Sequence, residues 1–274
     1  MDSLRKVDFH MHSNFSDGLF SPQELMKISA DAGLAAAGIA DHDTMSGLPE
    51  GQEAAGICGI EFIPGVEISI LDDGCEIHML GYYPRYLNQL KAALEEMQVE
   101  RFKRMDLIVD KLKKQGFKIK IEEVLAEAGK AAPGRLHLAR LLQKKRYVHT
   151  PAEAFSLYLN PGRPAYVPRI TMSVKQAMIL LKEVEAIPVI AHPGEKGKSV
   201  VDKLIPEGLA GIEVFHPDHS KSVASYYLEL AQEKRLIVTG GTDFHGDSKT
   251  KSVYPIELAI SYNYFAQMKG RICD

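Results

Sequence analysis

The sequence VDFHMH at residues 7–12 runs into SNFSDG at residues 13–18 and joins a short apolar run to two histidines. Val7 and Phe9 predict a β-strand over Val7–His10. Side chains two residues apart on an extended chain lie on one face, so His10 and His12 can grip the same ion. Asp17 follows in the polar loop. This segment therefore predicts a strand that ends in a pair of metal-binding histidines.

Further β-rich segments alternate with helical ones along the chain. The first helix has Ser21 as N-cap, Pro22 in its first turn and Gly33 as its stop. This alternation predicts an α/β fold built from βαβ units with a parallel sheet. The predicted strands are Val7–His10, Ala37–Ala40, Glu61–Ile68, Glu76–Leu80, Pro188–Ala191, Gly211–Phe215 and Leu236–Thr239. The predicted helices between them are Pro22–Ala32, Ser173–Glu185, Val200–Glu207 and Ser222–Lys234.

The middle of the chain has a different pattern. From Tyr86 to about Gly116, apolar residues recur at helical spacing with Lys and Glu between them. Ile121–Ala128 and Leu136–Lys144 predict shorter helices. We therefore expect residues 85–164 to form a helical insertion, or cap, between the two parts of one barrel domain, residues 1–84 and 165–274.

The composition is that of an ordinary globular domain. The 274 residues carry a formal net charge of −3, so no global positive field attracts duplex nucleic acid. No apolar run resembles a signal peptide or approaches the ~20 residues that span a bilayer, which favours a cytoplasmic protein without a membrane partner. The spacing of Cys58, Cys75 and Cys273 suits neither a disulfide framework nor a zinc ribbon.

Histidine, aspartate and glutamate gather where the predicted strands end. In a β/α barrel, functional groups collect at the C-terminal ends of the parallel strands. A single strand histidine is usually structural, but six in this position predict a metal site. The residues concerned are His10, His12, His42, Glu67, His78, His192, Asp243 and His245, with Asp17 in the first loop.

The types of donor atom limit which metal ions the site suits. Neutral imidazole and carboxylate suit Zn, Mn and Fe, and Mg also stays open. No cysteine takes part, which argues against a structural zinc site. We expect Asp8 and Asp43 to orient ligating imidazoles rather than bind metal themselves.

These segments resemble the PHP family, the polymerase and histidinol phosphatase superfamily. The resemblance rests on DFHMHSNFSDG at 8–18, GIADHDT at 38–44, IPGVEIS at 63–69, AHPG at 191–194 and GGTDFHG at 240–246. It implies a distorted (β/α)7 barrel, similar to a TIM barrel, with a centre of three divalent ions.

The resemblance also implies a division of the ligands. A first ion takes His10, His12, Glu67 and Asp243. A second shares Glu67 and adds His78 and His192. A third takes Asp17, His42 and His245; many family members have histidine at the position of Asp17, which leaves the affinity of this site open.

A subgroup of the family with a helical insertion is the closer match. It includes 3′,5′-nucleotide bisphosphate phosphatases and enzymes that trim the 5′ ends of short RNA. Its marks are GRLHLAR at 134–140 and EVFHPDH at 213–219. The resemblance implies that Arg135 and His219 contact a substrate phosphate, with His216 nearby. Each could instead be structural, as could His137 and His149.

Together these features predict a phosphoesterase. Clustered divalent ions lower the pKa of bound water, and the resulting hydroxide would attack phosphorus in line. Arg135 and His219 would add positive or hydrogen-bonding groups, and His245 or Asp243 could assist proton transfer. The expected substrates are small phosphate monoesters or terminal phosphodiesters of nucleotides or short 5′-phosphorylated oligonucleotides. No obligatory protein partner is expected.

Three alternatives remain at this stage. An amidohydrolase acting on C–N bonds also uses an HxH pair, but it normally has a bridging lysine where this chain has Glu67. A histidinol-phosphate phosphatase is possible within the same family. A non-catalytic metal-binding accessory module is possible too, although all nine expected ligand positions are filled.

Overall fold

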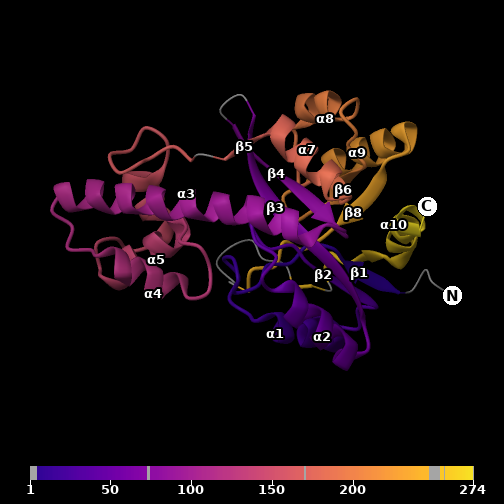
Figure 1. The fold of residues 1–274 in the computed structure, drawn as a ribbon, viewed down its shortest axis with the longest axis horizontal. Helices are drawn as coiled ribbons and strands as arrows, with labels where there is room; N and C mark the ends of the chain where they lie inside the picture. Colours follow the sequence, from indigo (N-terminus) through magenta and orange to yellow (C-terminus); the bar gives the residue numbers. More distant parts are fainter. Residues whose placement is uncertain (1–4, 73–74, 170, 247–253, 256, 274) are drawn as a thin grey trace.

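The computed structural model describes residues 5–72, 75–169, 171–246, 254–255 and 257–273. The first part of the chain alternates strands and helices, the middle is helical, and the last part alternates again (Figure 1). The strands are β1 (Lys6–Asp8), β2 (Ala36–Ile39), β3 (Glu61–Asp72), β4 (Cys75–Tyr82), β5 (Met172–Ser173), β6 (Ile187–Ile190), β7 (Gly211–Phe215), β8 (Ile237–Gly240) and β9 (Ile260–Ser261). The helices are α1 (Pro22–Asp31), α2 (Leu48–Cys58), α3 (Leu87–Lys114), α4 (Ile121–Ala128), α5 (Arg135–Lys144), α6 (Pro151–Ala154), the π-helical η2 (Phe155–Leu159), α7 (Val174–Glu183), α8 (Lys198–Leu204), α9 (Lys221–Lys234) and α10 (Tyr262–Cys273).

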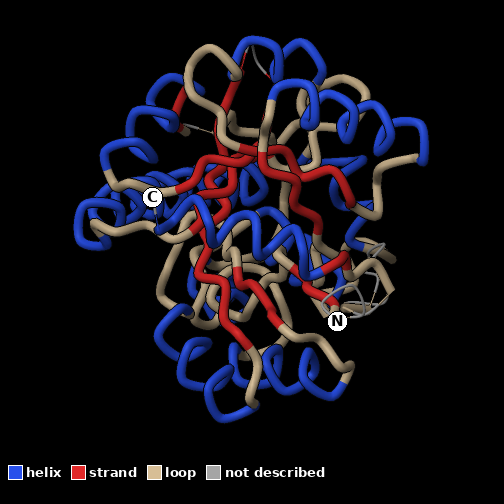
Figure 2. The backbone as a smooth tube through the Cα atoms, turned by 90° about the vertical axis from the view of Figure 1, so that its right-hand side faces the viewer, coloured by secondary structure: helices blue, strands red, loops and turns tan. Residues whose placement is uncertain are grey.

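Seven of the strands form a nearly closed barrel. Their order is β8-β7-β6-β4-β3-β2-β1, with β9 added beside β1 and β5 beside β3. The barrel closes where the Phe9 amide donates to the Gly240 carbonyl at 3.1 Å. A Cβ on Gly241 would lie 2.4 Å from the His10 Cβ, so glycine is needed for this approach. Helices surround the strands on several sides (Figure 2).

The sheet is mixed, which corrects the expectation of a parallel sheet. β4 runs antiparallel to both β3 and β6, while β1, β2 and β3, and likewise β6, β7 and β8, run parallel. Its reversal follows from the short connection to β3, because parallel neighbours need a long crossover and antiparallel ones need only a hairpin. The N-terminal half of β4 therefore lies at the same end of the barrel as the C-terminal ends of the other strands.

Among the described residues, four helical elements were not predicted: α2, α6, η2 and α10. α2 begins at Gly47 without a side-chain cap and contains Gly51 and Gly56, so its local signals are weak. It is held by tertiary packing, because Ala54 and Ala55 are buried beside Leu25 and Met26 of α1. α10 is rich in aromatic residues, and its Phe265 and Met268 pack into the barrel core.

The helical segment between β4 and β5 has a core of its own. Met105, Ile108 and Leu112 from the second half of α3 pack with Leu138 and Leu142 of α5. The first half of α3 packs through Leu90, Leu94 and Met97 on the barrel. Figure 1 shows α3 running from the barrel out to α4 and α5. α3 thus belongs to both cores, and the predicted domain boundaries at 84/85 and 164/165 remain a proposal.

Candidate metal centre

The structure brings all nine predicted ligand residues to one end of the barrel. Glu67 of β3 lies at the centre. Its carboxylate oxygens lie 2.9 Å from His42 Nδ1, 2.9 Å from His78 Nδ1 and 3.0 Å from His192 Nε2. His10 and His12 place their Nε2 atoms 3.4 and 3.3 Å from the same carboxylate. Strands far apart in the sequence therefore converge on one buried glutamate.

The register of the β3–β4 hairpin explains how His78 reaches this point. Ser69 pairs with His78, and Glu67 is two residues before Ser69 on β3. Residues two apart on a strand, and residues paired across strands, share one face of the sheet. Glu67 and His78 are therefore diagonal neighbours on that face, although His78 is not at the C-terminal end of its strand.

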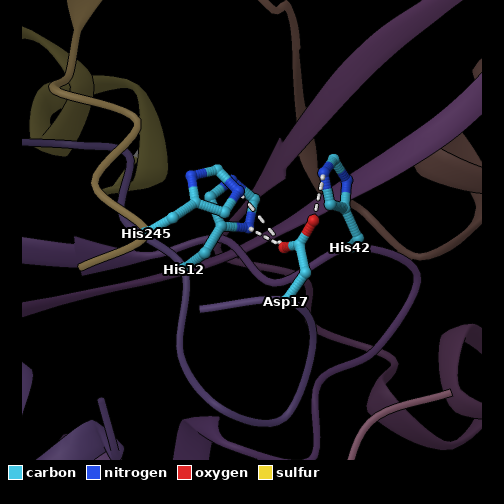
Figure 3. Close-up of side chains that lie close together, drawn as sticks. All are labelled: His12, Asp17, His42 and His245. Carbon is cyan, nitrogen blue, oxygen red and sulfur yellow. Dashed lines mark ion pairs between the residues drawn. The ribbon is translucent and has the colours of Figure 1, made fainter. Parts of the chain in front are cut away.

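A second gathering of donors surrounds Asp17 (Figure 3). Its carboxylate oxygens lie 3.2 Å from His245 Nε2, 3.9 Å from His42 Nε2 and 3.9 Å from His12 Nδ1. This group contains the predicted third set, Asp17, His42 and His245, with His12 added. Asp243 joins the other side of the centre, with Oδ1 2.9 Å from His12 Nε2.

The donor atoms form four groups of metal-binding geometry. Two of these groups meet at Glu67, and one matches the Asp17 gathering. The fourth brings in His216, which was predicted near the substrate rather than at the metal. The groups are His12-Asp17-His42-His245, His10-His12-Glu67, His42-Glu67-His78 and His192-His216-Asp243.

Unpaired buried atoms fit a metal at this place. Asp17 Oδ1, His42 Nδ1, Glu67 Oε2 and His78 Nδ1 are buried and have no hydrogen-bond partner among the described residues. Buried polar atoms are normally paired, because each unpaired one costs free energy. Imidazole and carboxylate donors pointing at common centres are what divalent transition metals bind.

The charges at the centre depend strongly on one another. Burial opposes ionisation of Glu67, but the imidazoles of His42, His78 and His10 outweigh it and hold its pKa well below the ordinary value. Burial likewise opposes the charge on His78, yet Glu67 and then Glu76 raise its pKa to about 10. The pKa of His12 shifts in the opposite direction, because burial, and then His245, lower it to about 4.

The sequence pattern of the PHP domain matches residues 8–151, more than half of the chain. The chain belongs to the PHP family. Its three-dimensional fold agrees: a structure described as a putative metal-dependent phosphoesterase from Bifidobacterium adolescentis has a TM-score of 0.88 and 28% sequence identity, covering 99% of this chain and 98% of that one. The predicted fold class is confirmed, and the protein is a PHP-family metal-dependent phosphoesterase.

Curated PHP relatives cover most of the chain. A phosphoribosyl 1,2-cyclic phosphate 1,2-diphosphodiesterase from Eggerthella lenta is 31% identical, over 87% of this chain and 94% of the relative. A 5′-3′ exoribonuclease from Haemophilus influenzae is 33% identical, over 88% and 90%. A 3′,5′-nucleoside bisphosphate phosphatase from Chromobacterium violaceum is 30% identical, over 88% of each. These relatives share the chemistry of phosphate esters and differ in substrate.

Glu213 is a residue of the PHP centre whose role sequence analysis missed. It is fully buried; Oε1 lies 3.0 Å from His10 Nδ1, and Oε2 accepts the His192 amide at 2.9 Å. It therefore fixes ligands from two strands. Its place at the start of EVFHPDH, on a strand facing His10 across the barrel, was the available signal.

The expected roles of Asp8 and Asp43 are corrected by their partners. Asp8 accepts the His10 and Thr242 amides and the Thr242 hydroxyl, and so joins the ends of β1 and β8. Asp43 accepts the Ser69 amide and pairs with Arg101 and Arg169. Both stabilise the backbone around ligands, and orientation of an imidazole falls to Glu213.

The predicted substrate residues lie around the centre. Arg135, the first residue of α5, lies 3.7 Å from Glu76 Oε2 and donates to the Leu159 carbonyl. His219 uses both ring nitrogens, with Nδ1 donating to the Val214 carbonyl and Nε2 accepting the Gly194 amide. A phosphate contact by His219 therefore needs one of these hydrogen bonds to be exchanged.

His216 is better suited to donate a hydrogen bond than to bind metal. Its Nδ1 accepts the Asp218 amide at 3.1 Å, which leaves the ring proton on Nε2. Nε2 lies 3.4 Å from Asp243 Oδ2 and has no hydrogen-bond partner within the part of the chain that the structure describes. A protonated nitrogen offers no lone pair to an ion, so His216 steadies the Asp243 carboxylate or faces the substrate.

Proposed function

We propose that this PHP protein hydrolyses phosphate monoesters or terminal phosphodiesters of nucleotides or short 5′-phosphorylated oligonucleotides. The observation that carries the proposal is the nine-residue donor cluster with Arg135 of the helical cap beside it. Guanidinium forks match phosphate oxygens, and the exoribonuclease and the bisphosphate phosphatase among the relatives act on such compounds. No helix among the described residues is long and apolar enough to cross a membrane.

The proposed centre holds three divalent ions, with Mn, Fe, Zn and Mg as candidates. His10, His12, Glu67 and Asp243 would hold the first, Glu67, His78 and His192 the second, and Asp17, His42 and His245 the third. Such ions supply Lewis acidity and lower the pKa of water.

The chain's own groups orient the substrate and the ligands. Glu213 holds His10 with Nε2 free to bind metal, and His216 Nε2 offers a proton towards Asp243 and the space beside it. Arg135 would bind phosphate oxygens, and His219 keeps the turn after His192 in place through Gly194. Hydrolysis then adds one water: a monoester yields an alcohol and phosphate, and a terminal diester yields an alcohol and a phosphate monoester.

The proposal is tested by phosphate release from 3′-phosphoadenosine 5′-phosphate, 5′-AMP, a short 5′-phosphorylated RNA and histidinol phosphate. Each is assayed with Mn²⁺ and with chelator. We expect chelator-sensitive release from the nucleotides and little from histidinol phosphate. Dominant release from histidinol phosphate would overturn the proposed substrate class. A protein that binds metal and releases neither phosphate nor mononucleotide from any of the four would instead act on another phosphoester or be an accessory module.

A further inference from the structure

Four arginines gather where the helical segment meets the barrel, beside the metal centre. Arg101 and Arg104 come from α3, Arg135 from α5, and Arg169 from the segment that returns to β5. We call these four residues the arginine cluster. Sequence analysis singled out only Arg135. The other three arginines are distant from it in the chain and belong to no motif.

Two carboxylates face the arginine cluster. Asp43 is fully buried and pairs with Arg101 at 3.0 Å and with Arg169. Glu76 pairs with Arg169 and lies 3.7 Å from Arg135. Arg104 donates from Nε to the Val167 carbonyl and, among the described residues, has no carboxylate within 4.0 Å.

The cluster therefore carries more positive than negative charge. Four guanidinium groups face two carboxylates, in side chains that are mostly shielded from water; those of Arg169 and Arg101 are 12% and 15% exposed. Burial, and then the charges of Arg135 and Arg169, lower the pKa of Arg104 to about 10. Uncompensated cations held close together in a shielded place favour an anion.

Glu76 connects the cluster to the metal centre. The Nδ1 atom of His78 lies 2.9 Å from the central Glu67, while its Nε2 lies 3.9 Å from Glu76 Oε1. One imidazole ring and one carboxylate thus separate the arginines from the central ligand. The Glu76 side chain is 34% exposed, whereas that of Asp43 is fully buried. Of the two carboxylates, Glu76 is the one that an incoming anion can replace.

We propose that the arginine cluster binds a second phosphate of the substrate, about one sugar unit away from the phosphate that is hydrolysed. Glu76 is the counter-ion that this second phosphate replaces. The inference rests on the proposed function and deepens it, because it makes two phosphates in one substrate the recognised feature. The second phosphate comes either from a nucleoside bisphosphate or from the first internucleotide link of a short oligonucleotide.

The test compares kcat/KM on substrates with one and two phosphates, using the Mn²⁺-loaded full-length protein. The substrates are p-nitrophenyl phosphate, 3′-phosphoadenosine 5′-phosphate and a 5′-phosphorylated dinucleotide. Arg104→Gln removes the arginine without a carboxylate partner. We expect the ratio of two-phosphate to one-phosphate kcat/KM to fall about tenfold or more, as for loss of a charge-assisted hydrogen bond.

Three further variants sharpen the comparison. Glu76→Gln removes the competing negative charge, so the same ratio rises. Lys103→Gln, next to Arg104 on α3, changes an exposed residue that pairs only with the half-buried Glu100 among the described residues, and all three kcat/KM values stay at wild type. Arg104→Lys keeps the charge and restores part of the ratio, which separates electrostatic binding from a packing defect.

Each outcome decides something. A loss confined to the bisphosphate or to the dinucleotide identifies the source of the second phosphate. An unchanged ratio in Arg104→Gln, or an equal loss on all three substrates, overturns the proposal. If the wild type turns over none of them, the proposed function fails, and binding of the bisphosphate and of AMP to the Mn²⁺-loaded protein becomes the measurement. Arg104-dependent preference for the bisphosphate would then preserve the subsite, and equal binding would remove it.

Discussion

Replacing Glu213 with glutamine tests how the barrel orders its metal ligands. The glutamate accepts from His10 Nδ1 with one oxygen and from the His192 amide with the other. Glutamine has the same shape but only one acceptor oxygen. If its NH₂ group faces His10, it donates to Nδ1 and drives the ring proton to Nε2, the atom needed for metal. If it faces His192, two N–H donors meet in a buried place.

Either orientation should weaken metal binding. Loss of a carboxylate that orients a metal-binding histidine typically costs about 10- to 100-fold in affinity or activity, or about 1.4 to 2.7 kcal/mol. Metal affinity is measured by competition with a chromogenic chelator, and thermal unfolding in excess chelator checks the fold. Glu61→Gln is the control, because Glu61 pairs with Lys269 and Arg5 away from the metal centre. A Glu213→Gln protein with wild-type affinity would refute this reasoning.

Three other changes probe the metal centre, the contact between cap and barrel, and the core of the cap. Replacing both His10 and His12 with alanine should abolish chelator-sensitive phosphate release while circular dichroism retains the helical content; full activity would exclude the metal mechanism. Asp43→Asn should cost about 3–5 kcal/mol of unfolding free energy at pH 7, because two arginines lose a buried partner. Burial opposes ionisation of Asp43, but Arg101 and Arg169 lower its pKa below the ordinary 3.8. This stabilisation is therefore present above about pH 4 and is lost at lower pH. Denaturant titrations of wild type and Asp43→Asn across pH 3–7 measure the difference in unfolding free energy, which should shrink on acidification. Leu138→Ala in the core of the cap should cost about 2–5 kcal/mol in chemical denaturation and leave metal content unchanged, since the ligands come from the barrel.

The seven barrel strands and most of the helices could be predicted because their signals are local, whereas the two-residue strands β5 and β9 were not predicted. Ser21 and Glu24 form the capping box of α1, and the ends of the seven predicted strands fall within two residues of the observed ones, except that β3 runs four residues beyond the predicted Ile68. The direction of β4 could not be read from its apolar residues, since hydrophobic pattern carries no polarity. The Asp73-Gly74 pair between two apolar runs was the available hairpin signal.

The gathering of the candidate metal ligands could be predicted from sequence because a barrel brings its strand ends together whatever their spacing in the chain. The residues around them could not. Arg169 and Asp43 are 126 positions apart, and only the path of the helical segment brings them into contact. Glu213 looked like any strand residue, because a buried carboxylate is recognised by its partners rather than by its neighbours in sequence.

The candidate ligands and the arginine cluster both favour an anion in the same part of the molecule. Six of the nine candidate ligands are imidazoles, which bring no charge when they bind metal, and only Asp17, Glu67 and Asp243 bring a negative one. Divalent ions held by this set would stay under-neutralised and would attract anions. The arginine cluster extends that positive region outwards beneath the cap, in a protein whose overall charge is −3. Attraction for phosphate is therefore local to the seam between barrel and cap, which favours small or end-bound substrates over a duplex that needs a broad basic surface.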